Sequence, residues 1–165
     1  MKPVHLVAVA LLAAFAVGAD SGVRFRAELT GLDEVPANFS SATGFFSARA
    51  VDGDTAIEYE LSYAGFATDV MASHVHFGQP FTNGGVSFFL CGGGGKPACP
   101  LREGTVSGRV VAADVVGPVA QGIVAGNLAA ILEMMRQGYA YANVHTMRSP
   151  SGEIRGQLKA VGAAQ

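Results

Sequence analysis

The sequence has few of the charged side chains with which proteins bind nucleic acids and membrane surfaces. Only 15% of its 165 residues are charged, and 11 basic against 13 acidic side chains leave a net charge of −2. Lysine and arginine form no run or patch along the chain. We therefore expect no nucleic-acid partner and no attraction to an anionic membrane surface.

The motifs of covalent catalysis are also missing. No serine lies in a Gly-x-Ser-x-Gly motif, and the glycines from Gly92 to Gly95 lack the Gly-Lys-Ser/Thr ending of a phosphate-binding loop. A hydrolytic triad is thus not expected, and the sequence assigns no catalytic residue. The chemistry it favours is binding rather than catalysis.

Long apolar runs are confined to one place, residues 4–17, between Lys2 and the small residues Val17-Gly18-Ala19. This run is shorter than the roughly 20 residues of a membrane-spanning helix. The pattern predicts a signal peptide over residues 1–19, cleaved after Ala19, and one secreted or periplasmic domain over residues 20–165. The alternative is a leader retained as a membrane anchor. No later segment is apolar enough to span a membrane.

Cysteine is scarce, since Cys91 and Cys99 are the only two in the chain. They enclose a glycine-rich segment. In an exported protein such a pair is expected to form a disulfide bond. The alternative is that the two thiols stay free or ligate a metal ion.

Most of the remaining chain alternates apolar and polar residues with a period of two, which is typical of half-buried strands. Turn residues such as Asp52-Gly53-Asp54 separate the runs. About eight strands are expected, at residues 23–29, 43–51, 57–63, 70–77, 85–90, 106–110, 139–146 and 154–160. The fold class is therefore all-β, a sandwich or a barrel.

One segment, residues 127–137, has helical rather than strand spacing of its apolar residues. Asn127 is suited to cap the helix at its start, and Gly138 to end it. We expect a single short helix that leads directly into the strand of residues 139–146.

Three histidines remain after the predicted leader, which contains His5. Alternate residues of a strand point to one face, so His74 and His76 share a face while Val75 and Phe77 occupy the other. In the strand of residues 139–146, His145 shares a face with Tyr141 and Asn143. If the two strands are neighbours, the three imidazoles meet and form a metal site with an open coordination position.

The predicted metal is copper, with zinc as the alternative. Imidazole binds both ions, and Met147 and Met71 are possible additional ligands whose thioethers would favour copper. No aspartate or glutamate has matching strand parity, so three protein ligands are expected. The competing interpretation is that the histidines are structural and that the methionines fill the core.

Two further groups of polar residues have simpler interpretations. Glu34-Val35-Pro36 is typical of a turn at the exit of a strand. Glu153 and Arg155 share one strand face, which is most often a surface ion pair.

Several short segments, in this order, are similar to the CHRD domain, a family named after chordin and also found in bacterial exported proteins. They are Ala27–Pro36, Ser41–Gly44, His74–Gly78, Gly104–Gly108, Tyr141–Thr146 and Pro150–Leu158. The resemblance covers roughly residues 23–161. The resemblance implies an extracellular, immunoglobulin-like β-sandwich with Greek-key connections. It also implies an alternative function, a non-catalytic module that binds an extracellular protein partner.

His74-Val75-His76-Phe77-Gly78 also resembles the copper-ligand strand of Cu/Zn superoxide dismutase. This likeness implies a third function, a copper-dependent redox enzyme. The bridging histidine and the acidic zinc ligand of that enzyme have no counterpart in the sequence. A homodimer is compatible with any of the three functions.

Overall fold

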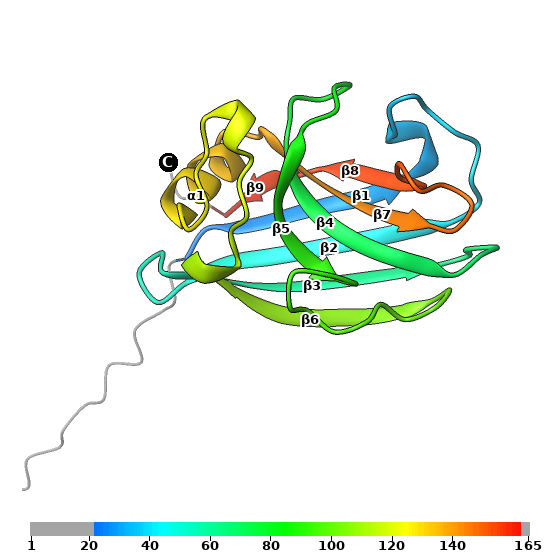
Figure 1. The fold of residues 1–165 in the computed structure, drawn as a ribbon, viewed down its shortest axis with the longest axis horizontal. Coiled ribbons are helices and arrows are strands. Elements are labelled where there is room, and N and C mark those ends of the chain that lie inside the picture. The colour runs from blue at the N-terminus through cyan, green and yellow to red at the C-terminus, as the bar shows by residue number, and fades with distance from the viewer. Residues whose placement is uncertain (1–21, 163–165) are drawn as a thin grey trace, which may run out of the picture.

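The computed structural model describes residues 22–162, which form an antiparallel β-structure with one α-helix (Figure 1). The predicted leader, residues 1–19, lies outside the described residues. Within the described part, no helix is long and apolar enough to cross a membrane. The strands are β1 (Arg24–Thr30), β2 (Thr43–Val51), β3 (Ala56–Ala64), β4 (Val70–Phe77), β5 (Gly85–Cys91), β6 (Gly104–Val111), β7 (Ala140–Thr146), β8 (Ile154–Gln157) and β9 (Lys159–Val161). The helices are α1 (Leu128–Arg136) and the 3₁₀ turns η1 (Gly31–Asp33), η2 (Ala112–Asp114) and η3 (Val119–Gln121).

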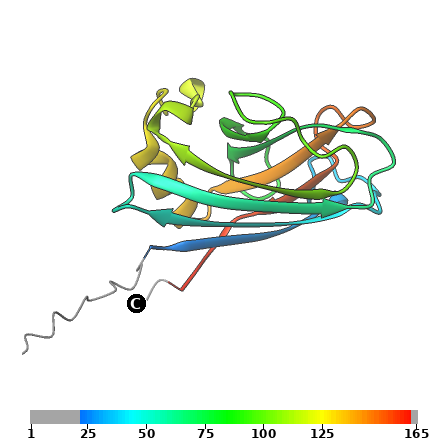
Figure 2. The same ribbon diagram turned by 90° about the horizontal axis from the view of Figure 1, so that it is seen from below.

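All nine described strands belong to one antiparallel sheet. Their order is β5-β4-β7-β8-β1-β2-β3-β6, and β9 pairs with β1. The sheet curls over until β5 and β6, at the two ends of this order, approach each other, so that the shape is nearly a barrel (Figure 2). The all-β prediction is confirmed. The immunoglobulin-like Greek-key sandwich is not confirmed, because hydrogen bonds link all the strands in a single sheet.

The period-two pattern of the sequence explains the core. In β1, Phe25, Ala27 and Leu29 are buried while Arg24 and Arg26 are exposed, and the same alternation continues along β3. The inward side chains of both halves of the curled sheet pack into one apolar cluster. Their burial is the main favourable contribution to folding.

The predicted helix is confirmed as α1, which covers one end of the curled sheet (Figure 1). Asn127 caps it, because its side chain accepts a hydrogen bond from the Ala130 backbone N–H. Gly138 follows the last turn with φ +77°, a left-handed conformation that glycine adopts without strain. The apolar face of the helix is buried through Leu128, Ile131, Leu132, Met134 and Met135.

Strands β7 and β8 depart from the expected pattern because both of their faces are buried. Their inner face packs on the core, and η1 lies against β8. Glu153 and Arg155 are only 3% and 2% exposed, so the interpretation as a surface ion pair is wrong. The Glu153 carboxylate instead accepts hydrogen bonds from the hydroxyls of Ser40 and Thr146.

The segment expected as one strand over residues 154–160 forms two, β8 and β9. The interruption falls at Leu158, whose backbone N–H donates to Ala140 while its side chain enters the core. β8 pairs with both β7 and β1, whereas β9 pairs only with β1. The chain therefore loses its pairing with β7 after Leu158, which a period-two pattern does not reveal.

Cys91 and Cys99 form the predicted disulfide bond, with their Cα atoms 5.1 Å apart. It closes the glycine-rich loop that follows β5. Gly93 and Gly94 lie on the ring of Phe89, so close that a Cβ atom at either position would clash with it. The disulfide thus holds a glycine loop against the end of the sheet that carries β4 and β5.

Replacing both cysteines by serine is expected to lower the free energy of unfolding by about 2–3 kcal/mol, because the short closed loop regains freedom in the unfolded chain. Urea denaturation of the two proteins measures this difference. An unchanged midpoint for the Cys91→Ser, Cys99→Ser variant would contradict it.

Candidate metal centre

The three histidines lie on neighbouring strands, as the sequence requires for a shared site. β4 pairs with β7 so that His74 is opposite Asn143, His76 opposite Tyr141, and Ala72 opposite His145. Val75, Ala142 and Val144 point to the other face and belong to the core. The imidazoles therefore gather on the face of the sheet that points away from the core.

The distances confirm that the three side chains converge. His74 Nδ1 lies 3.1 Å from His145 Nε2, and one nitrogen of each histidine falls within 4.8 Å of the others. Nitrogens bound to one ion at about 2.0–2.1 Å are at most about 4 Å apart. The widest pair must therefore close by about 1 Å to bind a common ion, which small side-chain rotations provide.

Backbone carbonyls fix the tautomers of two of the imidazoles. His145 Nδ1 lies 2.9 Å from the Pro150 carbonyl oxygen, and His76 Nδ1 lies 2.9 Å from the Gly84 carbonyl oxygen. A carbonyl only accepts, so each Nδ1 carries the proton and each Nε2 presents a lone pair. This arrangement is the outer-sphere support that orients histidine ligands in metal sites.

One of these lone pairs has no partner. His76 Nε2 is buried and accepts no hydrogen bond. The residue as a whole is only 7% exposed. A buried acceptor without a donor is unfavourable by about 1–3 kcal/mol. A bound cation would satisfy it, so the residues present fit a metal ion.

Burial also keeps the cluster neutral. Loss of solvent lowers the pKa of His74 to about 3, with a further contribution from His145, and it lowers the pKa of His76 to about 4. Burial likewise lowers the pKa of His145. Neutral imidazole is the form that binds metal ions, so no proton competes for these nitrogens near pH 7.

Aromatic rings enclose the cluster on two sides. The Phe89 ring packs edge-on against His74, with centroids 4.4 Å apart, and Tyr141 stacks parallel to His76 at 4.7 Å. The Arg155 guanidinium lies 3.4 Å from the centroid of the Tyr141 ring, so the tyrosine separates this cation from the imidazole. The rings hold the imidazole planes in place.

Glu34 is a site residue that the sequence interpretation missed. Its side chain is 6% exposed, and burial raises its pKa to about 7 against the opposing effects of Arg155 and of a hydrogen bond from Asn143. Through Asn143 it is linked to the histidines. Strand parity does not find it, because it comes from the loop after η1 rather than from a strand.

Gly152 makes room for this carboxyl group. A Cβ atom at Gly152 would lie 2.4 Å from Glu34 Oε1, and its φ of +128° also favours glycine. The turn Pro150-Ser151-Gly152 in the sequence is the signal that marks this position, although it does not name the residue that approaches it.

The methionines considered as additional ligands lie near the surface. Met71 is 49% exposed and Met147 is 65% exposed. Ligation by either thioether stays a prediction. Among the described residues, the three histidines form the only cluster of histidine, cysteine and acidic side chains close enough for one ion.

Comparison with family models identifies the domain. Residues 25–158 match the model of the CHRD domain. The chain belongs to the CHRD domain family. The match includes every residue of the candidate centre, from Glu34 to Arg155. No curated protein and no solved structure matches this CHRD domain.

The raised pKa of Glu34 makes the stability of the metal-free protein depend on pH. The ordinary pKa of a glutamate carboxyl is 4.5, and below this pH the stabilising contribution of neutral Glu34 is fully present. The contribution is lost as the pH rises through the pKa of about 7 in the folded protein. From pH 4.5 to pH 8, wild type should lose about 2–3 kcal/mol more unfolding free energy than Glu34→Gln.

Urea unfolding in the presence of a chelator, at pH 4.5 and pH 8, measures this effect. Glu133→Gln, at an exposed position of α1, is the matched control and should follow wild type. Parallel pH profiles for wild type and Glu34→Gln would show that this carboxyl does not titrate in the window.

Proposed function

We propose that this CHRD domain is an exported metal-binding protein that holds one transition-metal ion, copper ahead of zinc, through His74, His76 and His145. The convergence of three neutral imidazoles carries the proposal. Backbone carbonyls hold the Nδ1–H groups of His76 and His145, so that Nε2 of each carries a lone pair. Imidazole is a common ligand of both ions. The protein would bind, store or deliver the ion.

Export is supported by two independent features. The predicted leader is of the secretory type. The Cys91–Cys99 disulfide is typical of proteins that leave the reducing cytosol. An extracellular or periplasmic location suits a CHRD domain and would bring the site into contact with free metal ions.

Removal of two ligands tests the proposal. The His74→Ala, His76→Ala variant should bind Cu(II) and Zn(II) at least about 100-fold more weakly than wild type, because one imidazole alone remains. Isothermal titration and elemental analysis of tag-free protein measure affinity and stoichiometry. Undiminished binding by the variant, or no stoichiometric metal in wild type, would contradict the proposed metal site.

A Met71→Ala, Met147→Ala variant is the control and tests the thioether ligands at the same time. Both side chains are exposed, so their removal should not disturb the fold. If they are ligands, the affinity for Cu(I) falls while that for Zn(II) is kept, because thioether favours the softer ion.

The alternative function, binding of a protein partner without catalysis, has one observation in its favour. Phe39 and Phe81 are 95% and 83% exposed on two loops that a hydrogen bond from Asn83 to the Val35 carbonyl ties together. Exposed aromatic side chains of this kind are common in interfaces. Sedimentation of wild type against a Phe39→Ser, Phe81→Ser variant tests whether the partner is a second copy of the chain.

A further inference from the structure

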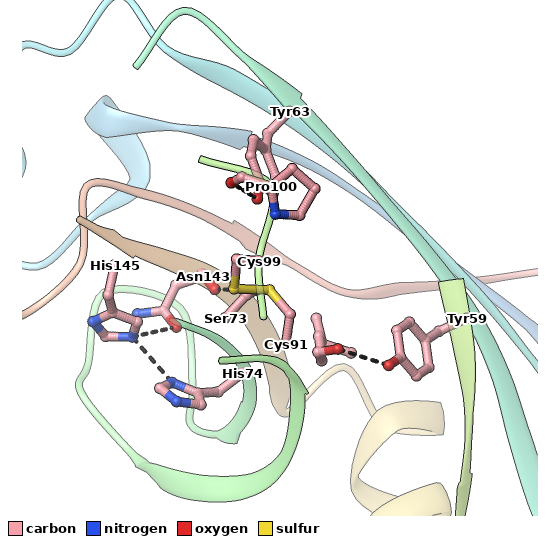
Figure 3. The surroundings of a disulfide bond; sticks show 10 residues. Tyr59, Tyr63, Ser73, His74, Cys91, Cys99, Pro100, Asn143 and His145 are labelled. Atoms are coloured by element: carbon pink, nitrogen blue, oxygen red, sulfur yellow. Dashed lines mark hydrogen bonds between the residues drawn. A yellow bond between two sulfur atoms is a disulfide. The ribbon is translucent and has the colours of Figure 1, made fainter. Parts of the chain in front are cut away.

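The side chain of Asn143 lies at the centre of the histidine cluster. Asn143 sits on β7 between His74 of β4 and Arg155 of β8, which are its register partners on either side. It is 3% exposed, and its Oδ1 lies 3.0 Å from His145 Nε2. Figure 3 shows His145 in contact with both His74 and Asn143.

The Asn143 amide presents its oxygen to His145, because Oδ1 is the amide atom that lies 3.0 Å from His145 Nε2. An amide oxygen accepts hydrogen bonds and binds cations, but it donates no proton.

This orientation creates a contact between two acceptors. The only proton of neutral His145 is held on Nδ1 by the Pro150 carbonyl, so Nε2 offers a lone pair. Asn143 Oδ1 also offers lone pairs, and only 3.0 Å separates the two atoms. Without a cation or a donor between them this part-buried contact is repulsive, whereas a cation turns both atoms into ligands.

We infer that Asn143 Oδ1 is a fourth protein ligand of the metal ion, which rests on the proposed function of the three histidines. The separations of 3.0 Å to Oδ1 and 3.1 Å to His74 Nδ1, both from His145 Nε2, match ligands of one ion. At metal–ligand distances of about 2.0–2.2 Å, such pairs subtend about 90–100°.

A fourth ligand of this kind changes the expected metal preference. Three imidazoles and an amide oxygen form a harder set than three imidazoles and a thioether. The oxygen ligand raises the affinity of the site for Cu(II) and Zn(II), whereas it raises the affinity for Cu(I) little. The site is accordingly one for divalent ions, and the oxygen closes the position that a three-histidine site leaves open.

Substitution of Asn143 tests the assignment, with Cu(II), Zn(II) and Cu(I) titrated separately as the probes. Asn143→Leu, which has a similar volume and no oxygen, should weaken Cu(II) and Zn(II) binding at least about 10-fold and change Cu(I) binding less than about 3-fold. Asn143→Asp keeps the shape and adds charge, so it should bind the divalent ions more tightly. Asn127→Asp, at the cap of α1, adds the same charge elsewhere and is the control.

A spectroscopic measurement gives a second readout. In Cu(II)-loaded wild type with ¹³Cγ-labelled asparagine, electron–nuclear double resonance should show a ¹³C coupling that Asn143→Asp abolishes. Wild type that binds Cu(II) without this coupling, and with unchanged affinity in both Asn143 variants, would overturn the inference and leave the three-histidine site intact. Wild type that binds no metal would overturn the proposed function itself.

Discussion

The register between β4 and β7 is the constraint on which the candidate centre depends. It sets His74 opposite Asn143 and His76 opposite Tyr141, while Val75 and Ala142 face the core. A shift by one residue would send every one of these side chains to the other face. The apolar residues that hold the register are thus the same ones that fix the imidazoles on the outer face.

The covering of that outer face gives the histidines their chemistry. Loops around Gly84 and Pro150 supply the carbonyls that fix two tautomers, and the enclosure lowers the pKa values of His74 and His76. An open sheet face would leave the same imidazoles hydrated and free to protonate near their ordinary pKa. The loops therefore keep the imidazoles neutral and oriented, which is the form in which they bind a cation.

Unpartnered buried polar atoms gather at the centre. Among the described residues five buried side-chain atoms lack a hydrogen-bond partner, and three of them belong to this face: Glu34 Oε1, His76 Nε2 and one nitrogen of Arg155. The other two are Ser87 Oγ and Gln157 Oε1. Unpartnered buried polar atoms are unfavourable for stability and tend to concentrate at functional sites. The apolar core, the helix cap of α1 and the disulfide provide stability that offsets the unfavourable burial of these polar atoms.

Local patterns in the sequence determined much of this protein. Alternation predicted most strands, Asn127 and Gly138 bounded the helix, and strand parity grouped His74, His76 and His145, because these properties depend on neighbouring residues. The single curled sheet, the break at Leu158, the burial of Glu153 and Arg155, and the approach of Glu34 to Asn143 were decided by tertiary structure. Each depends on which distant segment covers a given face, and residue spacing along one strand carries no record of that packing.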